Sequence, residues 1–152
     1  MKTSGKGAKM IYQLTLFLPN EPGCLARASS MLGDHGIQVY AIMVSSMNEA
    51  AIVRLICDDP EKASQLLSEQ GYHTIVTRVL ALEVLNKPGG LARLLQRLAS
   101  VDLNVEYVYC CTLPGSAVDI IAVSGDPVDI KLNQAGIVGL SQDELVELGR
   151  AT

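Results

Sequence analysis

An octet that occurs twice limits the possible folds of this chain more than any other feature. Residues 20–27 read NEPGCLAR, and residues 86–93, which begin 66 positions later, read NKPGGLAR. Six of the eight positions are identical. In both copies an apolar run precedes the octet and a helical pattern follows it. Two copies at this spacing indicate a duplicated small domain, because a solenoid needs three or more repeats.

Each octet has the composition of a tight turn that leads into a helix. Proline fixes φ at the first helical position and lacks an N–H group that would be unpaired there. The glycine behind it allows a close approach of backbone or ligand, and the asparagine ahead of it can shape the turn or cap the helix. The free N–H groups at such a helix N-terminus suit a carboxylate or phosphate. Ordinary turn-and-cap chemistry is the alternative, which the duplication weakens without removing.

The two copies predict the same order of elements. The first copy predicts strands at 11–18, 37–46, 50–57 and 72–77, with helices at 22–34 and 60–70, the second opened by Asp59 as cap. The second copy predicts strands at 79–85, 103–112 and 117–124, a turn at Leu113–Gly115, and helices at 88–100 and from Asp126–Pro127 to near Gly136. For the C-terminal stretch we favour a strand at 144–148 over a short helix capped by Ser141.

The predicted fold class is therefore α+β. Two ferredoxin-like βαββαβ units are expected, each a four-stranded antiparallel sheet with two helices on one face. We assign residues 10–77 to the first domain and 78–152 to the second. Residues 1–9 are rich in Lys, Gly and Ser without an apolar segment, so we expect a flexible tail and not a signal peptide. A unit this small buries little surface and leaves sheet edges to cover, which favours a homodimer.

Composition excludes several classes of protein. Hydrophobic residues make up 49% and charged residues 18% of the chain, which is typical of a packed globular protein. The net charge of −4 disfavours nucleic acid or an anionic membrane as partner. No apolar run reaches the ~18 residues of a membrane span. The four cysteines show no CxxC spacing, so we expect reduced thiols and a cytoplasmic location.

A βαββαβ unit with an N-x-P-G-x-L turn between its first strand and first helix resembles the ACT domain. The chain from about Tyr12 to Leu148 resembles a tandem ACT-domain protein with no catalytic domain attached. The residues that carry the resemblance are Asn20, Pro22, Gly23 and Leu25 in the first copy and Asn86, Pro88, Gly89 and Leu91 in the second. The resemblance implies regulatory, allosteric binding of a small molecule, usually an amino acid, at interfaces between ACT units.

The resemblance also implies two ligand-binding sites, in which each turn faces the second strand of a neighbouring unit. The candidate residues are Asn20, Glu21, Pro22, Gly23, Cys24, Leu25 and Gln38 for the first site, and Asn86, Lys87, Pro88, Gly89, Gly90, Leu91 and Asn104 for the second. The asparagines of the turns can accept a hydrogen bond from a ligand ammonium group. The copies differ at Glu21 against Lys87 and at Cys24 against Gly90, so they need not bind equally, and one can be silent.

Other functional readings are weaker. His35 and His73 lie far apart in sequence with no Ser/His/Asp order, so we expect no enzyme activity. We expect no cofactor and no metal site, because adjacent Cys110 and Cys111 would point to opposite faces of a strand without a second ligand cluster. RNA-recognition domains share the βαββαβ order, but the aromatic RNP pattern is absent.

Two hypotheses follow for the function. The first is a regulatory protein that binds an amino acid and passes the signal to a partner enzyme or regulator. The second is an interaction module, such as a regulatory subunit of an enzyme of amino-acid metabolism, whose turns bind no ligand. An enzyme that uses an unplaced cysteine or carboxylate is a third and remote possibility.

Overall fold

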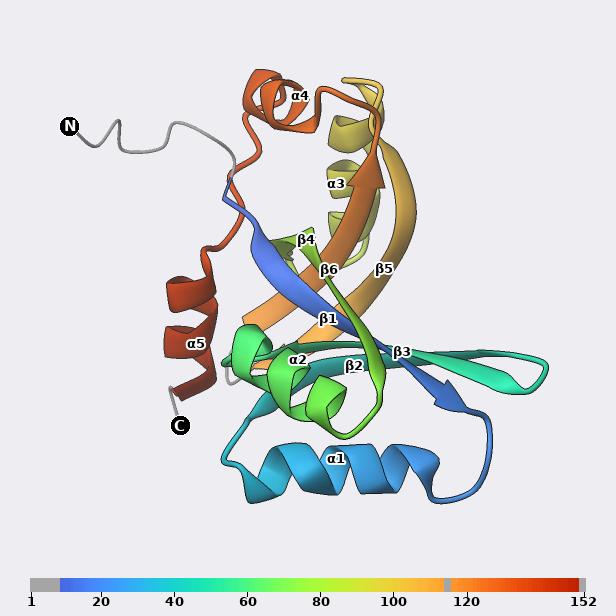
Figure 1. The fold of residues 1–152 in the computed structure, drawn as a ribbon. Helices are drawn as coiled ribbons and strands as arrows, with labels where there is room; N and C mark the ends of the chain where they lie inside the picture. The colour runs from blue at the N-terminus through green and yellow to red at the C-terminus, as the bar shows by residue number, and fades with distance from the viewer. Residues whose placement is uncertain (1–8, 114–115, 151–152) are drawn as a thin grey trace. The chain divides into compact units, whose positions relative to one another are not determined.

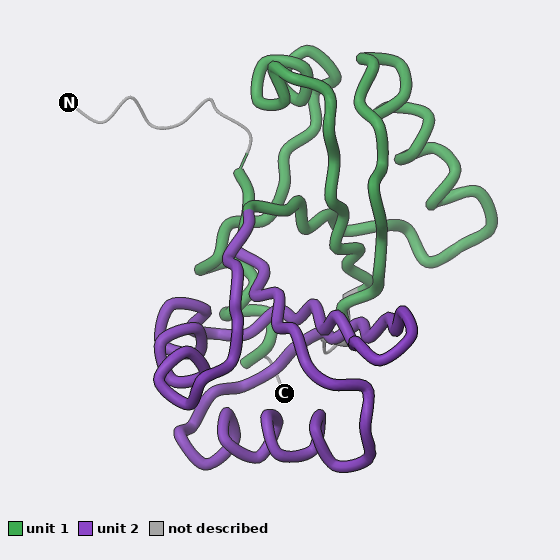
Figure 2. The backbone as a smooth tube through the Cα atoms, turned by 45° about the vertical axis from the view of Figure 1, so that its right-hand side comes forward, with its two compact units in different colours: residues 1–11, 78–152 green, residues 12–77 purple. Residues whose placement is uncertain are grey.

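The computed structural model describes residues 9–113 and 116–150. The predicted tail, apart from residue 9, and two residues of the predicted turn at Leu113–Gly115 lie outside the described residues. The chain divides into two compact units, one of residues 12–77 and one of residues 1–11 with 78–152 (Figure 2). Our two-domain assignment, with its boundaries at 10–77 and 78–152, stays a prediction.

The unit of residues 12–77 has the predicted βαββαβ order (Figure 1). Its strand order is β2-β3-β1-β4, and β1 and β2 both pair with β3 in antiparallel fashion. The elements are β1 (Ile11–Pro19), α1 (Cys24–Asp34), β2 (Val39–Met47), β3 (Ala50–Cys57), α2 (Pro60–Glu69) and the first part of β4 (His73–Glu83). Alternate residues of β1, among them Leu14 and Leu16, share one core with Leu32 of α1 and Leu67 of α2. Both helices therefore cover the same face of these strands.

The other unit contains the rest of β4, α3 (Gly90–Ala99), β5 (Asn104–Leu113), β6 (Ser116–Ser124), α4 (Val128–Gln134) and α5 (Gln142–Arg150). Its strand order is β4-β6-β5, again antiparallel. Leu98 of α3 and Leu132 of α4 are both fully buried in one core with Leu80 of β4 and Ile121 of β6. The α+β fold class is confirmed. None of the described helices is long and apolar enough to cross a membrane.

Three of the predicted strands need correction. The run predicted as strands 72–77 and 79–85 is the single strand β4, because it contains no Gly or Pro that would interrupt pairing. The strand predicted at 144–148 is part of helix α5. The hydroxyl of Ser141 accepts a 3.1 Å hydrogen bond from the amide of Glu144, whose carboxylate accepts a 3.3 Å bond from the amide of Ser141. This reciprocal pair is a capping box, so the alternative of a helix capped by Ser141 is the correct one.

The prolines open α2 and α4 differently. Asp59 caps α2 through a 3.1 Å hydrogen bond from the amide of Lys62, and Pro60 is the first helical residue, as predicted. In α4 the residue before the helix is Pro127 itself, and no side chain caps this end. The helix predicted to start at Asp126–Pro127 therefore begins later, at Val128.

Candidate functional site

The two octets form turns of the same backbone geometry. Gly23 precedes α1 with φ +87°, and Gly89 precedes α3 with φ +86°. This left-handed conformation is strained for residues with a Cβ atom, which explains glycine at both positions. The helices begin two residues later than predicted, at Cys24 and Gly90, because the left-handed glycine still belongs to the turn.

Three backbone hydrogen bonds occur at matching positions in the two turns. In the first turn they join Glu21 N to Pro19 O (3.0 Å), Cys24 N to Glu21 O (3.3 Å) and Arg27 N to Gly23 O (3.0 Å). In the second turn they join Lys87 N to Leu85 O (2.8 Å), Gly90 N to Lys87 O (3.1 Å) and Arg93 N to Gly89 O (3.1 Å). The duplicated sequence therefore encodes a duplicated turn.

Each turn leaves two amides of the first helical turn available. The N–H groups of Leu25 and Ala26 in α1, and of Leu91 and Ala92 in α3, have no hydrogen-bond partner among the residues that the structure describes. Such groups carry the positive end of the helix dipole and favour an anionic ligand. The free N–H groups predicted for each helix N-terminus are thus present in both copies. Pro22 and Pro88 lie outside the helices, where they shape the turns and do not occupy the first helical position as predicted.

Asn20 ties the first turn to the hairpin between β2 and β3. Its side-chain amide donates to the carbonyl of Asn48 (3.2 Å), and its backbone amide donates to the carbonyl of Glu49 (2.7 Å). Asn20 therefore positions the turn and does not cap the helix. Only its Oδ1 atom can still accept a hydrogen bond from a ligand.

The second turn opens onto a pocket of about 430 Å³. The pocket lies wholly within the unit of residues 1–11 and 78–152 and combines the turn with β5 and β6. Its lining residues are Val84, Leu85, Asn86, Lys87, Pro88, Leu91, Cys110, Ala117 and Asp119. Four of the predicted site residues, Asn86, Lys87, Pro88 and Leu91, are thus brought together, while Gly89 and Gly90 supply the backbone between them.

Cys110 and Asp119 are pocket residues that the sequence analysis did not place there. They pair directly across β5 and β6, and the thiol of Cys110 donates a 3.4 Å hydrogen bond to Oδ1 of Asp119. The hydrogen bond to this carboxylate, with a smaller effect of burial, raises the pKa of the Cys110 thiol. The signal in the sequence is the single charged residue of the apolar strand 116–124.

The first turn is packed differently. Cys24 is buried, and Nη2 of Arg27 lies 3.3 Å from its sulfur atom. A Cβ atom at Gly23 would lie 3.2 Å from Nη1 of the same arginine. The guanidinium of Arg27 is therefore folded back over the turn, which gives this copy its own positive charge next to the helix N-terminus.

A side chain such as that of Cys24 has no room in the second turn. A Cβ atom at Gly90 would lie 2.2 Å from the carbonyl oxygen of Leu85. The exchange of Cys24 for Gly90 between the copies is thus a steric requirement of the second turn.

The two candidate residues on second strands lie at the far end of their own units. Val39, next to Gln38, pairs with Cys57, whereas the turn end of the sheet pairs Met47 with Ala50. Since β2 has nine residues, the two ends are about 25 Å apart. Instead, the backbone amide of Gln38 donates a 3.1 Å hydrogen bond to Oδ1 of Asp58.

Asn104 has the equivalent position in the other unit. It pairs with Ser124, while Leu113 at the turn end pairs with Ser116. Its side chain donates to Oε1 of Glu106 (3.1 Å), which also accepts from the hydroxyl of Ser124. The hydrogen bond from Ser124, then that from Asn104, lowers the pKa of Glu106. Neither Gln38 nor Asn104 meets the turn of its own unit.

The remaining cysteine predictions concern reactivity and metal binding. All four cysteines are free thiols, and Cys110 is exposed while Cys111 is buried, as expected for neighbours on a strand. Burial raises the pKa of Cys57 to about 12 and that of Cys111 to about 11. Within residues 9–113 and 116–150, no three His, Cys, Asp or Glu side chains are grouped to hold a metal ion.

Known structures share this architecture. Protein BT0572 from Bacteroides thetaiotaomicron has 27% sequence identity and a TM-score of 0.82, over 93% of this chain and 99% of that one. The regulatory subunit of aspartate kinase from Thermus thermophilus has 20% identity and a TM-score of 0.60, over 85% and 91%. The corresponding subunit from Thermus flavus has 18% identity and a TM-score of 0.55, over 82% and 88%. The last two likenesses concern the fold alone.

Sequence comparisons give one family and no individual relative. No curated protein sequence matches this chain significantly. The family model of the ACT domain pair matches residues 9–130, which include both turns and all six strands. The chain therefore belongs to the ACT domain pair family.

Proposed function

We propose that this protein is a regulatory protein that binds an α-amino acid, and that the pocket of the second turn is its principal site. The observation that carries the proposal is the combination, in one pocket, of a helix N-terminus with unpaired amides, the ammonium group of Lys87 and the carboxylate of Asp119. A zwitterionic ligand needs both kinds of partner.

The anionic half of the ligand fits the turn. The amides of Leu91 and Ala92 are donors at the positive end of α3, and Lys87 adds a full charge. Charge-assisted hydrogen bonds of this kind are shorter and stronger than neutral ones. A ligand carboxylate at the start of α3 would gain contacts to both amides and to the Lys87 ammonium group.

The cationic half fits the acceptors of the same pocket. Asp119 is only partly exposed, and the side-chain oxygen of Asn86 is a second acceptor in the pocket. Leu85 and Leu91 add apolar surface to the pocket lining. A volume of about 430 Å³ accommodates a small molecule of amino-acid size.

The first turn is a second candidate for the same ligand class. It has the same glycine geometry and the same available amides, with Arg27 in place of Lys87 as the nearby cation. Its residues Asn20, Glu21, Pro22, Gly23, Cys24 and Leu25 stay predicted ligand contacts. Gln38 and Asn104 can contribute only to the turn of a neighbouring unit.

The test is a titration of the full chain with each of the twenty amino acids, followed by thermal unfolding and calorimetry. A ligand that binds the folded state raises the unfolding temperature with its concentration. Asp119→Asn and Lys87→Gln should each weaken binding by about tenfold, the loss of one charge-assisted hydrogen bond. Asp34→Asn, which removes an exposed carboxylate at the C-terminal end of α1, away from both turns, is the control. Equal affinity in Asp119→Asn, Lys87→Gln and the unaltered protein would refute this site.

An interaction module is the alternative function. The fold likeness to regulatory subunits of aspartate kinase favours it, because those proteins are named as subunits of an enzyme. If no amino acid changes the unfolding temperature, affinity capture with the full chain as bait should instead recover one partner enzyme. Regulation by an amino acid and association with such a partner are compatible, in which case the ligand changes the affinity for the partner.

A further inference from the structure

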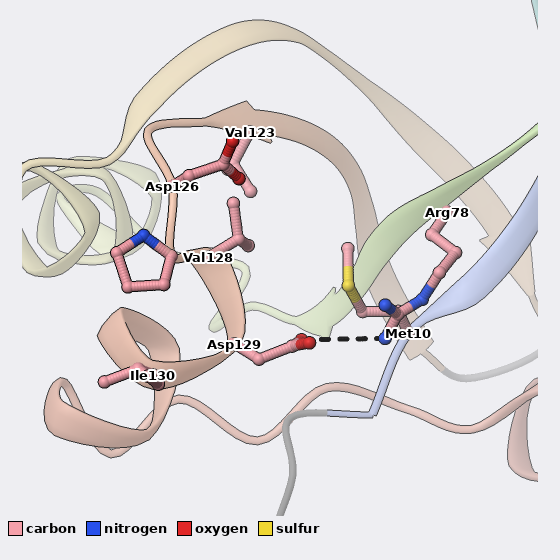
Figure 3. A pocket seen from close by; sticks show the side chains of 8 residues that line it. Met10, Arg78, Val123, Asp126, Val128, Asp129 and Ile130 are labelled. Atoms are coloured by element: carbon pink, nitrogen blue, oxygen red, sulfur yellow. Dashed lines mark ion pairs between the residues drawn. The ribbon is translucent and has the colours of Figure 1, made fainter.

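A second pocket, of about 500 Å³, lies at the other end of the unit that carries the second turn. β6 runs from Ser116, near the turn pocket, to Ser124, and this second pocket forms around the chain that leaves β6 for α4. Its lining residues are Met10, Arg78, Val123, Asp126, Pro127, Val128, Asp129 and Ile130 (Figure 3). None of them lines the turn pocket.

The charged groups of this pocket are incompletely paired. Figure 3 shows the carboxylate of Asp129 directed at the guanidinium of Arg78, with Oδ1 and Nη2 3.6 Å apart. This distance is longer than a normal hydrogen bond, and both side chains are half exposed. A guanidinium has five N–H donors, and this ion pair is its one polar contact among the described residues. Arg78 thus keeps the planar pair of donors that recognises a carboxylate.

Asp126 adds a second carboxylate to the same pocket. It is exposed, it does not cap α4, and it makes no hydrogen bond to another described residue. With Asp129 it provides two acceptors on the side of the pocket formed by the start of α4. The pocket thus has two carboxylates to one guanidinium, which leaves acceptor capacity for a ligand cation.

The rest of the wall is apolar. Val123 and Val128 are partly buried, as is Met10, whose flexible thioether adapts to varied shapes. Ile130 keeps 57% of its surface exposed beside them. Apolar walls with a few placed charges are typical of small-molecule sites.

We propose that this pocket is a second ligand site, separate from the turn pocket, for a small zwitterion with a branched apolar side chain. The ligand carboxylate binds the guanidinium of Arg78, and the ligand ammonium binds the carboxylate of Asp126. The side chain packs against Val123, Val128 and Met10. The contact between Arg78 and Asp129 opens to admit the ligand, which exchanges one weak ion pair for two charge-assisted contacts.

The competing reading is a surface ion pair with no ligand, since exposed pairs of this kind are common and contribute little. The experiment compares three probes of the same shape on the full chain: L-leucine, 3-methylbutylamine without the carboxylate, and 4-methylpentanoate without the ammonium group. Binding is followed by NMR of the methyl groups of Val123, Val128 and Ile130. This readout reports on this pocket and not on the turn.

We expect L-leucine to shift these methyl signals in a saturable way and both truncated probes to bind at least about tenfold more weakly, since each lacks one charge-assisted contact. Arg78→Gln should reduce the affinity for L-leucine by about tenfold and leave that for 3-methylbutylamine unchanged. Asp126→Asn should show the reverse preference, weakening the amine and sparing 4-methylpentanoate. Arg93→Gln, an exposed arginine that lines neither pocket, is the control.

Three outcomes would overturn the proposal. One is the absence of saturable shifts at these methyl groups with L-leucine. Another is shifts confined to Leu85 and Leu91, which would place the ligand in the turn pocket alone. The third is equal binding of L-leucine by the Arg78→Gln and Arg93→Gln proteins. Lys87→Gln separates the two sites, because it should weaken the turn pocket and leave the methyl shifts at Val123 and Val128 intact.

Discussion

The thiol of Cys110 donates a hydrogen bond to the carboxylate of Asp119 directly across β5 and β6, with Sγ and Oδ1 3.4 Å apart. This bond favours the neutral thiol, because the carboxylate accepts a hydrogen bond from the S–H group and disfavours a second negative charge beside it. The wall of the turn pocket therefore presents one carboxylate and one neutral thiol. In the site proposed above, Asp119 is the acceptor for the ligand, and the hydrogen bond from Cys110 fixes its orientation.

Removal of this carboxylate should make Cys110 more reactive. In Asp119→Ala the pKa of Cys110 falls toward that of a free thiol, so more thiolate, the nucleophilic form, is present at pH 8. The rate of alkylation by iodoacetamide should therefore rise, since the thiolate is the form that reacts. Mass spectrometry of the Cys110 peptide measures the rate. Asp143→Ala is the control. The buried Cys57 and Cys111 should stay unmodified while the protein is folded. An unaltered rate of alkylation of Cys110 in Asp119→Ala would contradict the role of the hydrogen bond.

The glycines of the second turn should differ in what they tolerate. Gly90→Ala places a methyl group 2.2 Å from the carbonyl of Leu85, so backbone must move, at a cost of about 1–3 kcal/mol. Gly89→Ala meets no atom within 4 Å, and its cost of about 1–2 kcal/mol comes from φ +86° alone. Urea unfolding measures both. Gly33→Ala, inside α1 with open space around it, should instead stabilise the protein by about 0.5–1 kcal/mol. A Gly90→Ala protein as stable as the unaltered one would show that the second turn relaxes freely.

The turns and the strand-helix order could be predicted because they rest on local signals. The duplicated octet, with its N-x-P-G-x-L pattern, requires a left-handed glycine. Alternating or helically spaced apolar residues within about ten positions define each neighbouring element. The pairing of Cys110 with Asp119 could not be predicted in this way. Register between β5 and β6 is set by packing of the whole unit, and a slip of one residue would turn Asp119 to the other face.

At the C-terminus the sequence allowed both a strand and a short helix, and the strand was preferred for a different reason. The S-x-x-E signal of a capping box is present at residues 141–144, but the analogy to the first copy favoured a strand. This analogy fails in the second unit. Helix α5 buries Leu145, and the segment directly before α5 bonds to β4 through one backbone hydrogen bond, from Leu140 N to Ala81 O. Local sequence was the better guide at this position than the repeat.

Two aspartates before prolines should differ in their effect on stability. Asp59→Ala removes the cap of α2, a 3.1 Å hydrogen bond to the amide of Lys62, and should cost about 1 kcal/mol. Asp126→Ala removes no cap and should change stability by less than about 0.5 kcal/mol. Urea unfolding of both variants under the same conditions tests the difference. A similar loss in both would mean that Asp126 supports α4 by a contact that the folded structure does not reveal.

The start of α5 should make stability depend on pH. Lys9 donates a 2.8 Å hydrogen bond to the carboxylate of Glu144, and this bond, followed by those from Ser141, lowers the pKa of Glu144. A carboxyl group whose folded pKa is lowered stabilises the protein above its unfolded pKa of about 4.3, and the contribution is lost as the pH falls through the folded value. Glu144→Gln should therefore be less stable at pH 7, by up to about 1 kcal/mol for such an exposed group. The difference in unfolding free energy between Glu144→Gln and the unaltered protein should close near pH 3. Urea unfolding at both pH values measures it, with Glu147→Gln one turn later as control. A gap that is unchanged at pH 3 would attribute the loss to helix packing and not to the charge of Glu144.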